Sequence, residues 1–75
     1  MKITVETGSW AKAFVGESLL ALDVAEGATV ADVIKVIGLP EDEAGLAVLS
    51  GRGVSREHVL CNGDALKIHP VIIGG

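Results

Sequence analysis

The chain ends on two glycines, Gly74 and Gly75, which directly follow the apolar run Val71-Ile72-Ile73. Because glycine has no Cβ atom, both residues can pass through a channel too narrow for a side chain. A carboxylate at the end of such a segment can be delivered into the active site of another protein. The glycines could instead be frayed chain, as termini often are. The three β-branched residues beside them favour the functional interpretation, with Gly75 as the reacting group.

The remaining residues with reactive side chains do not form a convincing catalytic or metal-binding group. His58 lies in a polar stretch and His69 would point away from the core, so both are interpreted as surface residues. The carboxylates at 41–43 are interpreted as part of a solvated connection. Cys61, the single cysteine, is interpreted as a small apolar filler. The alternative is a thiol that attacks an activated acyl group on a partner enzyme. We therefore expect no metal and no intrinsic catalytic residue, so that the protein is not itself an enzyme.

Size and charge restrict the class of protein further. A chain of 75 residues makes one domain, and its hydrophobic residues form no run near the roughly 18 needed for a membrane span. Ten acidic and six basic residues give a net charge of −4, which disfavours nucleic acid and favours partners with basic surfaces. The start of the chain resembles a strand and lacks the apolar stretch of a signal peptide. The expected location is the cytoplasm, away from membranes.

Apolar residues alternate with polar ones in the first part of the chain. This pattern predicts a strand around Ile3 and Val5 and a second strand over 20–24, paired as a hairpin. The stretch between them has no clean period and is expected to be a loop or a single turn. Within it, Trp10 or Phe14 would close one end of the core. The alternative role for Trp10 is an exposed anchor for a partner.

A helix is predicted over 29–37. Thr29 is a suitable N-cap, and Asp32 three residues later resembles the acidic member of a capping box. Gly38 provides a stop, and Pro40 prevents continuation. The apolar stripe has helical spacing and consists of Val30, Val33, Ile34 and Ile37.

The second half of the chain is predicted to complete a sheet. In order, we expect a strand at 46–49, a tight turn at 51–53, a short edge piece at 59–60, a turn at 62–64 and a last strand at 65–69 with Leu66 and Ile68 facing the core. One helix on one face of a mixed sheet is an α+β fold. If the first and last strands lie side by side in the middle of the sheet, the residues after Pro70 leave the sheet edge as a projecting tail.

Together these features resemble the ThiS/MoaD family of ubiquitin-like sulfur carriers. The matching segments cover almost the whole chain and are 26–33 at the helix entry, 46–48 with the Ser50-Gly51 turn, 60–64, and the end from Pro70 to Gly75. The resemblance implies a β-grasp fold: a mixed sheet of four to five strands, one main helix packed on one face, and a flexible C-terminal tail. It places the domain at 1–70 and the diglycine tail at 71–75.

Two features depart from the family pattern. Ser50-Gly51 stands where the family often has Asn-Gly. In the tail, Pro70 resembles the small subunit of molybdopterin synthase, whereas Val71-Ile72 resembles the carrier used in thiazole synthesis. Both pathways stay open, with a slight preference for the pterin pathway because of Pro70.

The resemblance implies chemistry at Gly75 carried out with other proteins. A separate ATP-dependent enzyme would adenylate its carboxylate, and a sulfur donor protein would convert it to a thiocarboxylate. The acceptor would be the large subunit of molybdopterin synthase or a thiazole synthase. The carrier itself would bind no cofactor and would be monomeric when free. The residues expected to bind partners are Pro70, Val71, Ile72 and Ile73.

Two alternatives remain beside the sulfur carrier. The first is a ubiquitin-like protein modifier, in which activated Gly75 is transferred to lysines of target proteins. The second is a β-grasp interaction domain whose terminus is inert.

Overall fold

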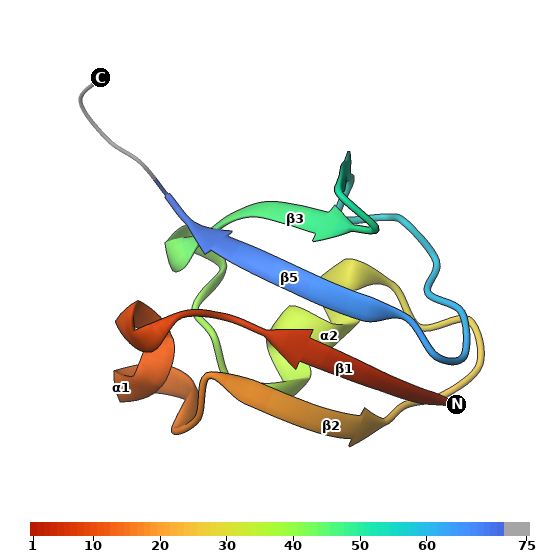
Figure 1. Cartoon of the computed structure of the whole chain (residues 1–75), viewed down its shortest axis with the longest axis horizontal. Helices are drawn as coiled ribbons and strands as arrows, with labels where there is room; N and C mark the ends of the chain where they lie inside the picture. Colours follow the sequence, from red (N-terminus) through yellow and green to blue (C-terminus); the bar gives the residue numbers. More distant parts are fainter. Residues whose placement is uncertain (72–75) are drawn as a thin grey trace.

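A mixed sheet of five strands forms one layer of the protein, and one main helix packs behind it (Figure 1). The computed structural model describes residues 1–71. The strands lie in the order β2-β1-β5-β3-β4, and their bounds are β1 (Lys2–Glu6), β2 (Leu19–Asp23), β3 (Ala44–Leu49), β4 (Arg52–Val54) and β5 (Ala65–Pro70). This arrangement confirms the predicted α+β class and the single helix on one face of a mixed sheet.

The first and last strands are neighbours in the middle of the sheet, which meets the condition set for a projecting tail. β1 and β5 run parallel, with Val5 opposite Leu66. On one side β2 pairs antiparallel with β1, and on the other side β3 pairs antiparallel with β5. Alternate residues of the strands point into the core because successive side chains of a strand face opposite sides. The largest fully buried side chains come from this face and from the helix, and are Val5, Val30, Val33, Ile34, Leu66 and Ile68.

The main helix, α2 (Val30–Val36), confirms the predicted element and its capping. The Thr29 hydroxyl accepts a hydrogen bond from the Asp32 N–H at 3.2 Å, and the Asp32 carboxylate accepts one from the Thr29 N–H at 3.0 Å. This reciprocal pair satisfies two N–H groups that the helix leaves without partners. The Thr29 backbone N–H, followed by its hydroxyl, lowers the pKa of Asp32. Gly38 ends the helix with a φ of 82°.

Residues 9–15 fold into a 3-10 turn, η1 (Ser9–Ala11), followed by one helical turn, α1 (Lys12–Val15). This is slightly more structure than the predicted loop or single turn. Trp10 packs half-buried against the core, whereas Phe14 is 43% exposed. Trp10 is therefore the residue that closes this end of the core, and the arrangement does not favour its alternative role as an exposed anchor.

The connection after β3 differs from the predicted one. The tight turn lies at Ser50 and Gly51, which both have positive φ, so Arg52 and Gly53 belong to β4. The prediction of a turn at 51–53 was wrong by about one residue, and the short strand of the sheet is β4. The predicted edge piece at 59–60 forms only an isolated bridge between Val59 and Thr29.

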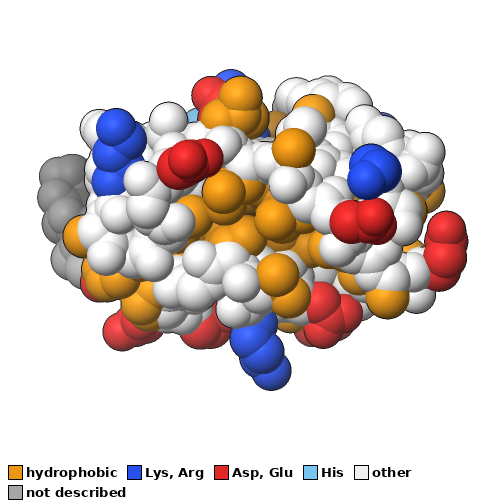
Figure 2. Space-filling view, turned by 90° about the horizontal axis from the view of Figure 1, so that it is seen from below, with side chains coloured by type: hydrophobic (Ala, Val, Ile, Leu, Met, Phe, Trp, Pro, Cys, Tyr) orange, Lys and Arg blue, Asp and Glu red, His pale blue; other side chains and the backbone are white. Residues whose placement is uncertain are grey.

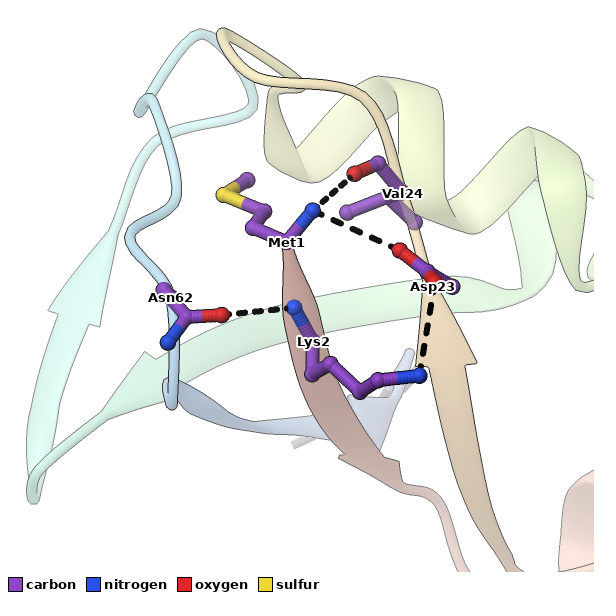
Figure 3. Close-up of polar contacts among 5 residues, drawn as sticks. All are labelled: Met1, Lys2, Asp23, Val24 and Asn62. Atoms are coloured by element: carbon purple, nitrogen blue, oxygen red, sulfur yellow. Dashed lines mark hydrogen bonds and ion pairs between the residues drawn. The ribbon is translucent and has the colours of Figure 1, made fainter.

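The start of β1 is bonded to two other segments (Figure 3). The Met1 ammonium group donates to the Val24 carbonyl at 2.7 Å and to Asp23 at 3.4 Å. The Lys2 ammonium group contacts the other Asp23 oxygen at 3.3 Å, and the Lys2 N–H donates to the Asn62 side chain at 2.8 Å. These bonds join β1 to the end of β2 and to the predicted turn before β5. The Lys2 side chain, followed by the Met1 ammonium group, lowers the pKa of Asp23.

Candidate functional site

β5 carries the chain from the centre of the sheet to the candidate C-terminal segment. β1 pairs with β5 only up to Lys67, whereas the pairing with β3 continues to Pro70, opposite Ala44. The end of β5 therefore runs beyond β1 and is held by β3 alone among residues 1–71. Pro70 and Val71 are both exposed there. The other predicted binding and reacting residues lie outside the described residues and are Ile72, Ile73, Gly74 and Gly75.

Gly45 allows β3 to approach the end of β5 closely. The pairing of β3 with β5 is irregular between Ala44 and Ala47, so β3 bulges at this point. A Cβ atom built on Gly45 would lie 2.5 Å from the Pro70 carbonyl oxygen and 2.8 Å from the carbonyl oxygen of His69. Any residue other than glycine would push the two backbones apart.

The bulge is braced by Arg56, which follows β4. Its guanidinium group donates to the carbonyl oxygens of Ala44 and Gly45 at 2.7 and 2.9 Å and to the Glu41 carboxylate at 3.1 Å. The planar fork of arginine suits such simultaneous contacts. The Arg56 side chain is only 28% exposed, so these bonds are partly shielded from water, whereas Glu41 is 68% exposed.

We call the group formed by Glu41, Ala44, Gly45, Arg56 and Pro70 the tail base. Its contacts hold the start of β3 against the end of β5, where the chain leaves the sheet. Gly45 and Arg56 could not be singled out from the sequence. The Arg56 contacts span 11 to 15 residues, and no local pattern signals them.

Cys61 lies at the opposite end of β5 and is exposed, so its interpretation as an apolar filler was wrong. The neighbouring Leu60 fills the core instead, at 3% exposure. Cys61 contributes its N–H to the Asp64 carboxylate at 2.8 Å in the turn before β5. Six residues of strand, roughly 17–20 Å, separate this turn from Pro70. The thiol is therefore remote from the tail base.

His58 and His69 are exposed, as predicted for surface residues. Within residues 1–71, no three side chains of the His, Cys, Asp and Glu types come together in a group that could hold a metal ion. In the same part of the chain, no helix has the length and apolar character needed to cross a bilayer.

The strand order, the parallel central pair and the helix on one face define a ubiquitin-like β-grasp protein. The chain belongs to the Mut7-C ubiquitin family, whose model matches residues 15–73. This confirms the predicted ubiquitin-like relationship. No curated protein sequence matches the chain.

Solved structures show the same fold. SAMP1 from Haloferax volcanii has a TM-score of 0.76 at 18% identity, with all of both chains covered. The putative molybdopterin converting factor subunit 1 from Pyrococcus furiosus has a TM-score of 0.76 at 24% identity, covering 96% of this chain and 99% of its own. The ubiquitin of Caldiarchaeum subterraneum has a TM-score of 0.64 at 27% identity, covering 100% and 98%.

Proposed function

We propose that the protein is a ubiquitin-like sulfur carrier whose reacting group is the Gly75 carboxylate. In this proposal it serves as a protein substrate for other enzymes and has no catalytic group of its own. The broader class, a ubiquitin-like carrier or modifier, is supported by the family match and by neighbours titled as a modifier, a converting factor and a ubiquitin.

The observation that carries the proposal is the geometry at the end of β5. Pro70 and Val71 are exposed, and the strand there has already passed the end of β1. A segment that starts at this point can extend from the domain without disturbing the buried core. The tail base keeps the starting point fixed, which favours delivery of the segment into a partner's channel.

The proposed chemistry begins with activation, because a carboxylate is a poor electrophile. An activating enzyme joins the Gly75 carboxylate to the AMP part of ATP and releases pyrophosphate. A persulfide on the donor protein attacks the acyl carbon and expels AMP, leaving an acyl disulfide. A thiol then cleaves that disulfide, and the carrier keeps one sulfur atom as a thiocarboxylate. The thiocarboxylate donates its sulfur in the synthesis of a pterin or a thiazole cofactor.

Exchange of labelled pyrophosphate into ATP tests the first step. The full chain is incubated with ATP-dependent activating enzymes from the source organism. We expect exchange with the full chain and none with a chain lacking Gly75 or extended by one alanine. Cys61→Ser is the control and should support normal exchange, because the thiol is remote from the tail base. Normal exchange with both altered termini would contradict the proposal.

A protein modifier is the second candidate, and the neighbour titled small archaeal modifier protein 1 favours it. It shares the adenylate with the carrier but transfers the acyl group to a lysine. Isopeptide-linked conjugates in cells, lost when Gly75 is removed, would select the modifier. The third candidate, an interaction domain with an inert terminus, predicts two results. Partner binding should persist without Gly74 and Gly75, and the full chain should support no pyrophosphate exchange.

A further inference from the structure

The outer edge of β2 offers backbone groups for hydrogen bonding. Met1 and Val24 exchange a pair of bonds across β1 and β2, at 2.7 and 2.8 Å. Such pairs alternate along an antiparallel ladder, so Leu19, Ala21 and Asp23 direct their N–H and C=O groups away from β1. β2 is the end strand of the sheet, and no strand within residues 1–71 covers these groups.

This edge continues at Asp23 into a groove of about 510 Å³ between β2, the following loop and α2. Its apolar wall includes Val24, Val33 and Val36. Val36 is 65% exposed although it belongs to the helix that covers the core. Figure 2 views the molecule from the β2 side and shows hydrophobic side chains gathered in a hollow, with charged side chains around it.

The carboxylates around the groove differ in how they are paired. Three carboxylates, those of Asp23, Glu26 and Asp32, line it against the single ammonium group of Lys35. Asp23 is paired with Lys2 and the Met1 ammonium group, whereas Glu26 has no ion-pair partner within residues 1–71. The protein as a whole carries a net charge of −4. An occupant with a cationic side chain near Glu26 therefore complements this part of the rim.

We propose that the β2 edge and this groove bind an extended, lysine- or arginine-flanked apolar segment of a partner protein, which adds to the sheet as a strand beside β2. Main-chain bonds to Leu19, Ala21 and Asp23 supply binding energy, as in other strand-addition complexes. Apolar side chains on alternate positions enter the groove beside Val36. A cationic side chain at the end of the segment lies near Glu26. The site is separate from the tail base and does not depend on the chemistry at Gly75.

The probe is a short synthetic peptide of alternating valine and threonine with lysines at both ends and blocked termini. Its control is the same peptide with glutamates in place of the lysines. Binding to the full chain is followed by NMR. We expect the amide signals of Leu19, Ala21 and Asp23 to shift and their hydrogen exchange to slow when the lysine peptide binds. The glutamate peptide should bind at least several-fold more weakly.

Matched variants test the two walls of the site. Val36→Ser should weaken binding, whereas Leu46→Ser, at a similarly exposed position on β3, should leave it unchanged. Glu26→Gln should weaken binding roughly fivefold, the equivalent of one exposed ion pair of about 1 kcal/mol, whereas Glu57→Gln should not. Ala21→Pro removes one outward N–H while leaving the bonds to β1, and should also weaken binding.

Three results would overturn the proposal. The first is equal binding of the lysine and glutamate peptides. The second is a set of shifted signals on the outer face around Lys67 and not along β2. The third is self-association through the β2 edge without any peptide, which would make a second copy of this chain the occupant.

Discussion

The backbone of Gly45 lies directly against the carbonyl group of Pro70. A Cβ atom at position 45 would stand 2.5 Å from that oxygen, closer than real Cβ atoms come to other heavy atoms. The glycine therefore allows the start of β3 and the end of β5 to pair where the chain leaves the sheet. Position 45 is thus coupled to the geometry at the end of β5.

Gly45→Ala should destabilise the fold by about 1–3 kcal/mol, because the added methyl group meets backbone atoms that cannot rotate away. Urea unfolding measures the change. Gly53→Ala is the matched control in the neighbouring strand β4, where the nearest atom is the end of the flexible Leu46 side chain at 3.2 Å. That variant should lose less than about 1 kcal/mol. Equal losses at both positions would refute the close-approach argument.

Arg56→Gln should cost about 1–3 kcal/mol of unfolding free energy, because it removes charged donors from the carbonyl groups of Ala44 and Gly45. Glu41→Gln should cost at most about 1 kcal/mol, since that carboxylate is largely exposed. Chemical denaturation of both variants provides the comparison. A larger loss for Glu41→Gln would show that the ion pair, and not the carbonyl contacts, holds the bulge.

Acid should destabilise the fold through Asp23 and Asp32. Both carboxyl groups have a folded-state pKa below the ordinary value of 3.8, so their charged forms favour the folded state. Their contribution is therefore present above about pH 4 and is lost as the pH falls through the lowered folded pKa values. Asp32→Asn should flatten the dependence of Tm on pH in this acid range.

The matched control for this titration is Asp42→Asn. Its carboxylate accepts no hydrogen bond within residues 1–71, and the residue lies in the exposed 3-10 turn η2 (Glu41–Glu43). Its Tm curve should keep the acid dependence of the parent chain. A parallel loss of slope in both variants would rule out the capping-box bond as the cause.

Cys61→Ser should change the unfolding free energy by no more than about 0.5 kcal/mol, as expected for an exposed side chain whose backbone makes the local bonds. It should also leave pyrophosphate exchange intact. Thiol alkylation of the parent chain gives an independent check, because the exposed sulfur should react without unfolding. Loss of pyrophosphate exchange in the serine variant would show that the Cys61 thiol takes part in the activation step.

Elements with a local signal could be predicted from the sequence. The sequence of α2 carries its cap, its apolar stripe and its stop within ten residues, and all three are present in the folded protein. Alternation also placed the inward face of β1 and β5 correctly, with Val5 and Leu66 fully buried. The α+β class followed from the order of these elements, and the resemblance to the ThiS/MoaD carriers implied the β-grasp fold.

Features that depend on distant residues could not be predicted in this way. The exposure of Cys61 depends on how its turn meets the sheet, and the adjacent Leu60 took the core position instead. β4 has only three residues, which is too short for a recognisable alternation. Its pairing with β3 depends on the turn at Ser50 and Gly51, which both have positive φ. The brace from Arg56 to Ala44 and Gly45 requires the folded bulge before it can form.

The reacting role of Gly75 is tested most directly by the mass of the C-terminal peptide, measured on protein isolated from the cells that produce it. The proposal predicts a fraction of peptide that ends at Gly75 and in which one oxygen is replaced by sulfur. Treatment with an alkylating agent should label that sulfur. A peptide that continues beyond Gly75, or a terminus that carries only oxygen while the sulfur donor and activating enzyme are active, would contradict it.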